Sequence, residues 1–160
     1  PHGTAGDKII EPGDLVVCDF GATYQGYHSD MTRTIVVGRA TPKQEEIYHL
    51  VLEAQLAGLE TVKAGQLCHD VDQAARQIIA DHGYGESFGH SLGHGVGLHI
   101  HENPRLAQGN HLTLQPGMVV TVEPGIYLNG WGGIRIEDMV TVTESGCDIL
   151  TQTSKTLTEI

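Results

Sequence analysis

Apolar residues recur at two different spacings along the chain, and these spacings separate predicted strands from predicted helices. Pro-Gly turns at 12–13 and 116–117 each begin a β-rich run, and each run is followed by a second one, at 30–36 and 135–140. Short β-rich runs joined by turn residues predict β-hairpins. Between the two hairpins, apolar residues at positions 47, 50, 51 and 54 recur at helical spacing.

Two helices are expected between the hairpins. The first begins with Thr41 as its N-cap, Pro42 at the first helical position and Gln44 completing a capping box, and it ends before Gly65. The second is expected from about 68 to 82. Each helix has an apolar side that suits packing on a sheet. The pattern therefore predicts an α+β fold, with antiparallel hairpins covered by helices.

An internal repeat relates the two hairpins. Residues 11–21 read EPGDLVVCDFG and residues 115–125 read QPGMVVTVEPG, at an offset of 104 positions. In each copy one carboxylate follows the proline by seven positions and another lies on the return strand: Asp19 and Asp30 in the first, Glu123 and Glu137 in the second. An approximate twofold axis would point all four into one space. The alternative is that any two hairpins share Pro-Gly turns and valines.

Composition narrows the expected partners and location. The 160 residues carry 20 Asp and Glu against 9 Lys and Arg, for a formal charge of −11. Such acidity repels phosphate backbones and anionic membranes, so neither nucleic acid nor membrane is expected as a partner. No apolar run approaches the roughly 20 residues of a membrane helix. Three widely spaced cysteines and no visible signal peptide favour the cytoplasm.

Several acids gathered in a half-buried space need protons or cations, because unpaired buried charge is costly. The segment 88–102 reads FGHSLGHGVGLHIHE and places four histidines within twelve residues. Its glycines allow the backbone to approach closely, so these side chains can reach a common point. Four carboxylates and one imidazole suit Mn²⁺, Fe²⁺ or Co²⁺. Five ligands fit two bridged ions, and a single Ca²⁺ site is the alternative.

Five motifs, in this order, resemble the catalytic domain of the pita-bread metallopeptidases, which include prolidase (Xaa-Pro dipeptidase), Xaa-Pro aminopeptidase and methionine aminopeptidase. They are PHG at 1–3, CDFGATYQGYHSDMTRT at 18–34, FGHSLGHGVGLHIHE at 88–102, TVEPGIY at 121–127 and GGIRIEDMV at 132–140. The resemblance implies the pita-bread fold, with its hairpins in a pseudo-twofold arrangement. The short spacing from Glu123 to Glu137 resembles the Xaa-Pro members, because methionine aminopeptidases usually carry a longer insertion there.

The resemblance also implies roles for nine side chains. Two divalent ions would be bound by Asp19, Asp30, His94, Glu123 and Glu137, with Asp30 and Glu137 bridging. The expected metal is Mn²⁺, with Co²⁺, Fe²⁺ and Zn²⁺ as alternatives. The implied catalytic residues are His90, which stabilises the tetrahedral intermediate, Glu123, which relays a proton, and His101 and Arg135; the implied substrate-binding residues are His2, His101 and Arg135. The alternative for Arg135 is pairing with the ligand carboxylates.

The implied activity is hydrolysis of the peptide bond between an N-terminal residue and proline, by a hydroxide that bridges the two ions. The substrate would be a small peptide with proline at its second position. The sequence leaves dipeptidase and aminopeptidase open. It also leaves open a methionine aminopeptidase-type or other hydrolase of this fold, and a non-catalytic module that binds metal or protein.

Residues 1–160 are expected to form a C-terminal catalytic metallopeptidase domain that is incomplete on its N-terminal side. The chain begins without Met, and a first helical segment and a separate N-terminal domain, which the resemblance implies, would precede the PHG motif. The full-length protein is expected to be a homo-oligomer. Phe88, Tyr127 and Trp131 are candidates for lining the pocket, with packing as the alternative for each.

Overall fold

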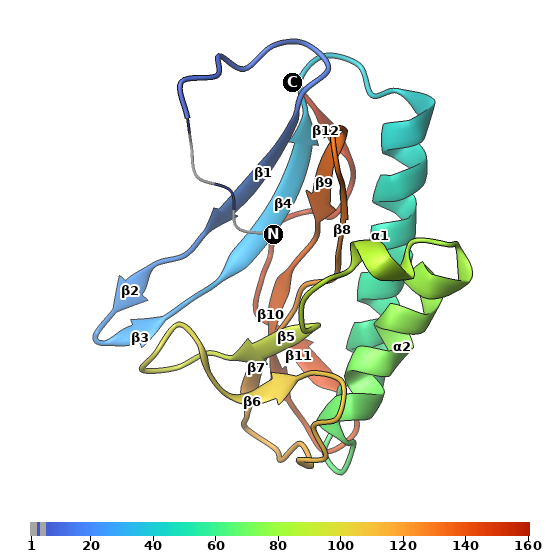
Figure 1. Cartoon of the computed structure of the whole chain (residues 1–160). Coiled ribbons are helices and arrows are strands. Elements are labelled where there is room, and N and C mark those ends of the chain that lie inside the picture. Colours follow the sequence, from blue (N-terminus) through green and yellow to red (C-terminus); the bar gives the residue numbers. More distant parts are fainter. Residues whose placement is uncertain (1–2, 4–5) are drawn as a thin grey trace.

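The computed structural model describes residues 3 and 6–160, so the predicted substrate residue His2 lies outside the described residues. Figure 1 shows an elongated α+β molecule in which two helices lie along one side of the strands. The helices are α1 (Pro42–Thr61) and α2 (Cys68–Asp81). The strands are β1 (Leu15–Phe20), β2 (Thr23–Tyr24), β3 (Tyr27–His28), β4 (Met31–Val36), β5 (Gly93–Gly95), β6 (Glu102–Leu106), β7 (Val119–Val122), β8 (Gly125–Leu128), β9 (Gly132–Arg135), β10 (Asp138–Val142), β11 (Cys147–Ile149) and β12 (Thr158–Glu159).

The first predicted hairpin is confirmed. Strands β1 and β4 are antiparallel, and the small ribbon of β2 and β3 extends from their end. The turn at its tip has positive φ at both Gln25 (50°) and Gly26 (86°), as a tight two-residue hairpin turn requires. Strand β12, near the end of the chain, pairs in parallel with β4. This arrangement makes a three-stranded sheet with the order β1-β4-β12.

The second predicted hairpin forms as two separate ladders. Strand β7 pairs with β10 inside a five-stranded sheet of order β11-β10-β7-β5-β6, and β8 pairs with β9 as a ribbon of its own. The ladder is interrupted at Pro124, which has no N–H to donate. The interruption leaves Glu123 on one strand and Glu137 on the other at the break between the ladders.

The two halves of the molecule meet along a seam between β4 and residues 135–138. The Glu137 N–H donates to the Thr32 carbonyl at 3.1 Å, and these two residues form an isolated antiparallel bridge. Two residues further along β4, the Thr34 hydroxyl accepts from the Arg135 N–H at 3.0 Å and donates to the Arg135 carbonyl at 2.9 Å. Hydrogen bonding through threonines on β4 therefore joins the halves.

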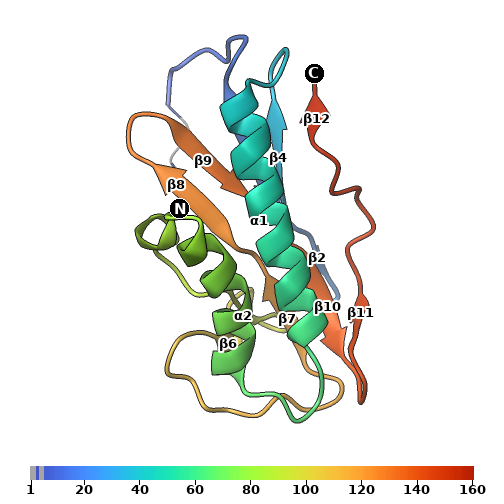
Figure 2. The ribbon, with the colours of Figure 1, turned by 90° about the vertical axis from the view of Figure 1, so that its right-hand side faces the viewer.

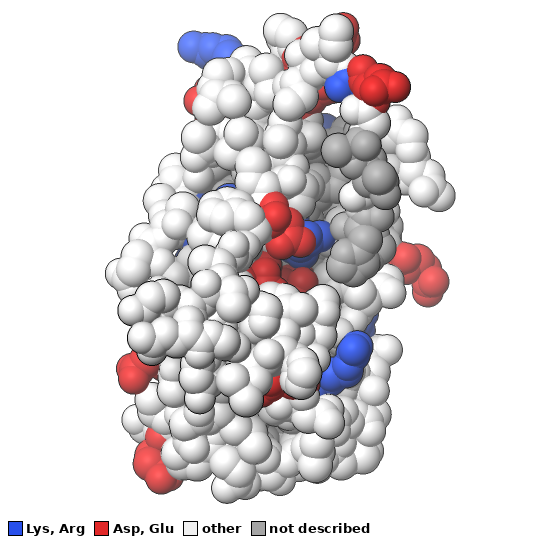
Figure 3. Space-filling view, turned by 90° about the vertical axis from the view of Figure 1, so that its left-hand side faces the viewer, with Lys and Arg blue, Asp and Glu red and all other residues white. Residues whose placement is uncertain are grey.

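The predicted helices cover the strands on one side (Figure 2). The capping box of Thr41 and Gln44 is present, and both helices end close to their predicted ends. Their buried apolar residues form one core with those of the sheets. Gly58 lets α1 lie close, because a Cβ there would fall 2.9 Å from Cγ1 of Val122. No helix of the described residues covers the other side of the strands, and acidic side chains gather on that face (Figure 3).

Among the described residues, no helix is both long and apolar enough to cross a membrane.

Candidate metal centre and active site

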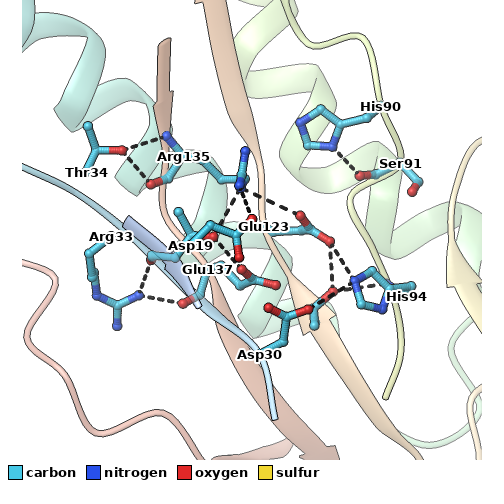
Figure 4. Close-up of polar contacts among 12 residues, drawn as sticks. Asp19, Asp30, Arg33, Thr34, His90, Ser91, His94, Glu123, Arg135 and Glu137 are labelled. Carbon is cyan, nitrogen blue, oxygen red and sulfur yellow. Dashed lines mark hydrogen bonds and ion pairs between the residues drawn. The ribbon is translucent and has the colours of Figure 1, made fainter. Parts of the chain in front are cut away.

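The structure brings the five implied ligands together from strands that lie far apart in the sequence (Figure 4). They are Asp19 on β1, Asp30 just before β4, His94 on β5, Glu123 after β7 and Glu137 before β10. Their ligand atoms form two groups in which all atoms lie within 4.8 Å of one another: Asp19, Asp30 and Glu137, and His94, Glu123 and Glu137. A third such group is Asp30, His94 and His101. Glu137 is shared by the first two groups, as a bridging ligand would be.

The orientation of His94 directs one ring nitrogen toward the carboxylates. Its Nδ1 lies 3.0 Å from the Gly95 carbonyl, which only accepts, so Nδ1 carries the hydrogen. Nε2 then presents a lone pair toward Glu123 Oε1 at 3.2 Å and Asp30 Oδ2 at 3.6 Å. Burial lowers the pKa of His94, but the hydrogen bonds to Glu123 and Gly95 and the nearby carboxylate charges outweigh it and raise the pKa. A proton or a cation is needed between these acceptors.

Glu137 is the most deeply buried of the four implied ligand carboxylates, at 1% exposed. Its Oε2 accepts from the Thr32 hydroxyl at 2.6 Å, and its Oε1 has no hydrogen-bond partner among the described residues. Burial, followed by the charges of Glu123 and Asp30, raises the pKa of Glu137 to about 9. Burial and the charge of Asp19 raise the pKa of Asp30 to about 6. Bound cations would satisfy the unpartnered oxygen and remove the repulsion, so the donor set fits divalent metal ions.

Thr121 on β7 aligns two of the implied ligands. Its hydroxyl donates to Glu123 Oε1 at 3.1 Å and accepts from the His94 N–H at 3.0 Å. The close approach of β5 to β7 depends on Gly93, because a Cβ there would fall 1.9 Å from the Thr121 carbonyl oxygen. The glycines of the histidine-rich segment were expected to allow a close approach of the backbone, and Gly93 does so.

A chain of hydrogen bonds links Asp19 to His90. Arg135 donates from Nη2 to Asp19 at 2.5 Å and from Nη1 to the Tyr127 hydroxyl at 2.9 Å. The Tyr127 hydroxyl lies 3.1 Å from His90 Nε2, and His90 Nδ1 lies 2.9 Å from the Ser91 carbonyl. Since that carbonyl only accepts, Nδ1 donates and Nε2 accepts from Tyr127. Burial lowers the pKa of His90, which favours this neutral ring.

The geometry bears directly on Arg135 and Tyr127. Arg135 pairs with the Asp19 carboxylate and lies 3.9 Å from Glu123, which is the alternative to a substrate role. These contacts do not test whether Arg135 binds substrate, so its substrate role stays a prediction. Tyr127 is part of the site through its hydroxyl. Phe88 is buried and packs edge-on against His90 at 4.9 Å, and Trp131 lines a separate groove beside β1.

Two cavities that share His101 open beside the carboxylates. One of about 370 Å³ is lined by His90, Ser91, His94, His101, Arg105, Ala107, Glu123 and Arg135. The other, of about 400 Å³, includes Asp19 and Asp30 in its lining. The His101 ring lies 4.3 Å from that of His94 between centroids. Figure 3 shows acidic side chains gathered beside basic ones in a hollow of one face. The cavities have the size of small-molecule sites.

Sequence reasoning missed three polar residues at this site. Thr32 and Thr121 hydrogen-bond the carboxylates, and Arg105 lines the cavity. Thr32 occupies a strand position whose side chain shares a face with Thr34, and this alternation was the one available signal. Arg105 follows the histidine-rich segment, and nothing in its spacing distinguishes it from a surface arginine.

Comparison with known proteins shows the family to which the chain belongs. Residues 1–144 match the model of metallopeptidase family M24, and the chain belongs to this family. It is 56% identical over 157 residues to the Xaa-Pro dipeptidase of Pyrococcus horikoshii, covering 98% of this chain and 45% of that protein. Among solved structures, an Xaa-Pro dipeptidase from Bacillus anthracis has a TM-score of 0.98 at 54% identity, covering all of this chain and 45% of that one.

An X-Pro aminopeptidase from Thermotoga maritima is also similar, with a TM-score of 0.97 at 48% identity, covering all of this chain and 46% of that one. The chain therefore spans about half the length of the relatives it matches. These matches confirm the predicted family and the predicted α+β pita-bread fold. Membership of a metallopeptidase family also agrees with a site built for divalent metal ions.

We predict that the stability gained from metal grows with pH. In the metal-free fold the pKa of Glu137 is about 9, above its ordinary value of 4.5, so the folded state holds a proton that the unfolded state has lost. Stability of the metal-free protein should then fall as pH rises from 6 to 8.5, by at most about 1.4 kcal/mol per pH unit for one proton. Thermal unfolding in EDTA and in Mn²⁺ measures the widening difference in Tm.

The control for this prediction is Glu137→Gln, which cannot ionise. Its Tm in EDTA should depend less on pH over the same range. An identical pH dependence in the wild type and in Glu137→Gln would contradict the assignment.

Proposed function

We propose that the protein hydrolyses the peptide bond between an N-terminal residue and proline, using two divalent metal ions. The observation that carries the proposal is the pair of ligand groups that share the buried Glu137. Supporting it is 56% identity to a protein named Xaa-Pro dipeptidase. In the proposed site, Asp19, Asp30 and Glu137 would hold one ion, and His94, Glu123, Asp30 and Glu137 would hold the other. An oxygen-rich set with one imidazole supports Mn²⁺ as the metal.

Bound metal ions would supply a nucleophilic water of lowered pKa and a Lewis acid for the scissile carbonyl. The chain supplies the proton transfers. Glu123, whose Oε1 accepts from Thr121, would relay a proton toward the leaving nitrogen. Nε2 of His90 is an acceptor in the resting arrangement, so it would take up a proton released by the attacking water and then stabilise the tetrahedral intermediate by donating from Nε2. His101 and Arg135 would complete the site on the leaving-residue side.

Arg105 supports a dipeptidase over an aminopeptidase. It lies in the lining of the same cavity as His90, His94 and Glu123. A dipeptide ends in a free carboxylate directly after the proline ring, and a guanidinium binds such a group with two parallel hydrogen bonds. An aminopeptidase instead must let the chain continue. The aminopeptidase stays the second candidate, because the X-Pro aminopeptidase from Thermotoga maritima shares this fold at 48% identity.

Several properties of the whole protein stay predictions. They include homo-oligomerisation, the substrate contact of His2 and the place of this chain as the catalytic part of a longer protein. A location in the cytoplasm also stays a prediction, and the three cysteines, all free thiols, agree with it. A non-catalytic binding module is a weaker alternative, since such a role requires neither the aligned His90 nor a complete ligand set.

The direct test is hydrolysis of an Xaa-Pro dipeptide and an Xaa-Pro tripeptide by the full-length protein with added Mn²⁺. We expect cleavage of the dipeptide, with release of free proline measured chromatographically. Cleavage of both peptides would identify an aminopeptidase. If metal binds stoichiometrically and neither peptide is cleaved, the proposed enzymatic function is wrong.

A second prediction separates metal binding from catalysis. Asp30→Ala should remove metal from both positions, because Asp30 is proposed to bridge them. His90→Ala should keep the metal and lose about 100-fold or more in kcat, the usual effect of removing one stabilising hydrogen-bond donor. Metal content by elemental analysis and kcat on the dipeptide are measured together. Equal loss of metal in both variants would contradict this division of roles.

A third prediction concerns Arg105→Gln. It should raise KM for the dipeptide by about tenfold or more, because the two charge-assisted hydrogen bonds to the carboxylate are lost. The C-terminally amidated dipeptide lacks the carboxylate, so its KM should change little. Arg39→Gln, at an exposed position after β4, is the matched control. The carboxylate contact is excluded if Arg105→Gln changes KM equally for both peptides.

A further inference from the structure

A second charged cluster lies behind the candidate site, on the side of the seam that faces α1. Asp138 accepts from Arg33 Nη2 at 2.8 Å, from Gln55 Nε2 at 2.9 Å and from Lys155 Nζ at 2.6 Å. Asp138 is 0% exposed and Arg33 is 6% exposed. We call these four residues the rear cluster. None of them belongs to the proposed ligands or substrate contacts.

All five N–H groups of Arg33 point to acceptors. From Nη1, one reaches the Thr32 carbonyl at 2.8 Å and the other the Glu137 carbonyl at 2.5 Å. The remaining three reach Asp138 and the carbonyls of Thr153 and Ser154. Thr32 and Glu137, whose carbonyls accept from Nη1, are the two residues that bridge the seam. One planar group therefore holds both sides of the seam from behind.

Thr32 and Glu137 also make the contact that orients the Glu137 carboxylate, on the side of the seam that faces the candidate site. The Thr32 hydroxyl donates to Glu137 Oε2 at 2.6 Å. Asp19 lies opposite Thr32 in the register of β1 and β4, and Asp30 lies two residues before it. Glu123 and His94 come from the other side of the seam. A shift across the seam would therefore change the spacing between the carboxylates of the two halves.

Burial gives the rear cluster the strength to fix this spacing. An exposed ion pair contributes little, whereas removing one member of a buried pair leaves an uncompensated charge and is strongly destabilising. The planar fork of Arg33 also cannot be replaced by lysine, whose ammonium is a single point charge on a flexible stem.

We propose that Arg33 and Asp138 are positioning residues for the metal centre: from behind the sheet they set the spacing across the seam on which metal affinity depends. The inference rests on the proposed function of the site as a two-metal centre. Contacts one layer outside the ligands commonly change metal affinity about 10–100-fold when they are removed.

Two variants test this role in different ways. Arg33→Lys keeps the positive charge and loses the planar fork, and Asp138→Asn keeps the shape and loses the negative charge. The control is Ile79→Ala, which opens a cavity in the core on α2, an element that contributes no residue to the seam. Each full-length protein is stripped with chelator and titrated with Mn²⁺ by calorimetry, at a temperature where circular dichroism shows it folded.

We expect the Kd of at least one Mn²⁺ ion to rise about tenfold or more in Arg33→Lys and in Asp138→Asn, the two seam variants. In Ile79→Ala the Kd for Mn²⁺ should stay within about twofold of the wild-type value, even if its Tm falls as far as that of Arg33→Lys or Asp138→Asn. KM for the peptide at saturating Mn²⁺ should change little in any variant, because no substrate contact is altered.

Unchanged Mn²⁺ affinity in the seam variants, or an equal loss in Ile79→Ala, would overturn the inference and leave the proposed function standing. A wild-type protein that binds no Mn²⁺ would overturn both. Should Asp138→Asn fail to fold, Arg33→Lys alone decides the outcome.

Discussion

Four carboxylates and an imidazole lone pair lie close together in one partly buried space. The electrostatic repulsion among these groups is the constraint on which the rest of the site depends. Burial and the neighbouring carboxylate charges raise the pKa of Glu137 to about 9 and that of Asp30 to about 6, so without cations these groups hold protons more readily. Divalent ions relieve the repulsion while keeping every carboxylate ionised. The unpartnered Oε1 of Glu137 is the clearest mark of a ligand-binding role.

The fold places this charge at the junction of two half-sheets. Asp19 and Asp30 come from the first hairpin, Glu123 and Glu137 from the ladders interrupted at Pro124, and β4 joins the halves through Thr32. The helices lie along the opposite side of the strands and leave the side with these carboxylates uncovered by helix among the described residues (Figures 1 and 2). Polar contacts in front of the seam and the buried rear cluster behind it hold the ligands at a spacing that repulsion alone would widen.

Local patterns in the sequence predicted much of this arrangement. Capping residues such as Thr41 set the helix start, and the repeated turn and acid positions predicted that carboxylates of the two copies, such as Asp19 and Glu137, would meet. The division of the second hairpin was not predicted, because a single Pro124 inside a β-rich run does not show where pairing resumes. Arg105 and the rear cluster depend on contacts between distant segments, for which one sequence carries no signal.

We propose that two cations, sharing Glu137, balance the charge of this site. Anomalous scattering from crystals of the Mn²⁺-loaded protein tests it most directly. We expect two peaks per chain, about 3.5–4 Å apart, with Glu137 coordinating both. A single peak, or a pair of peaks that Glu137 does not bridge, would contradict it.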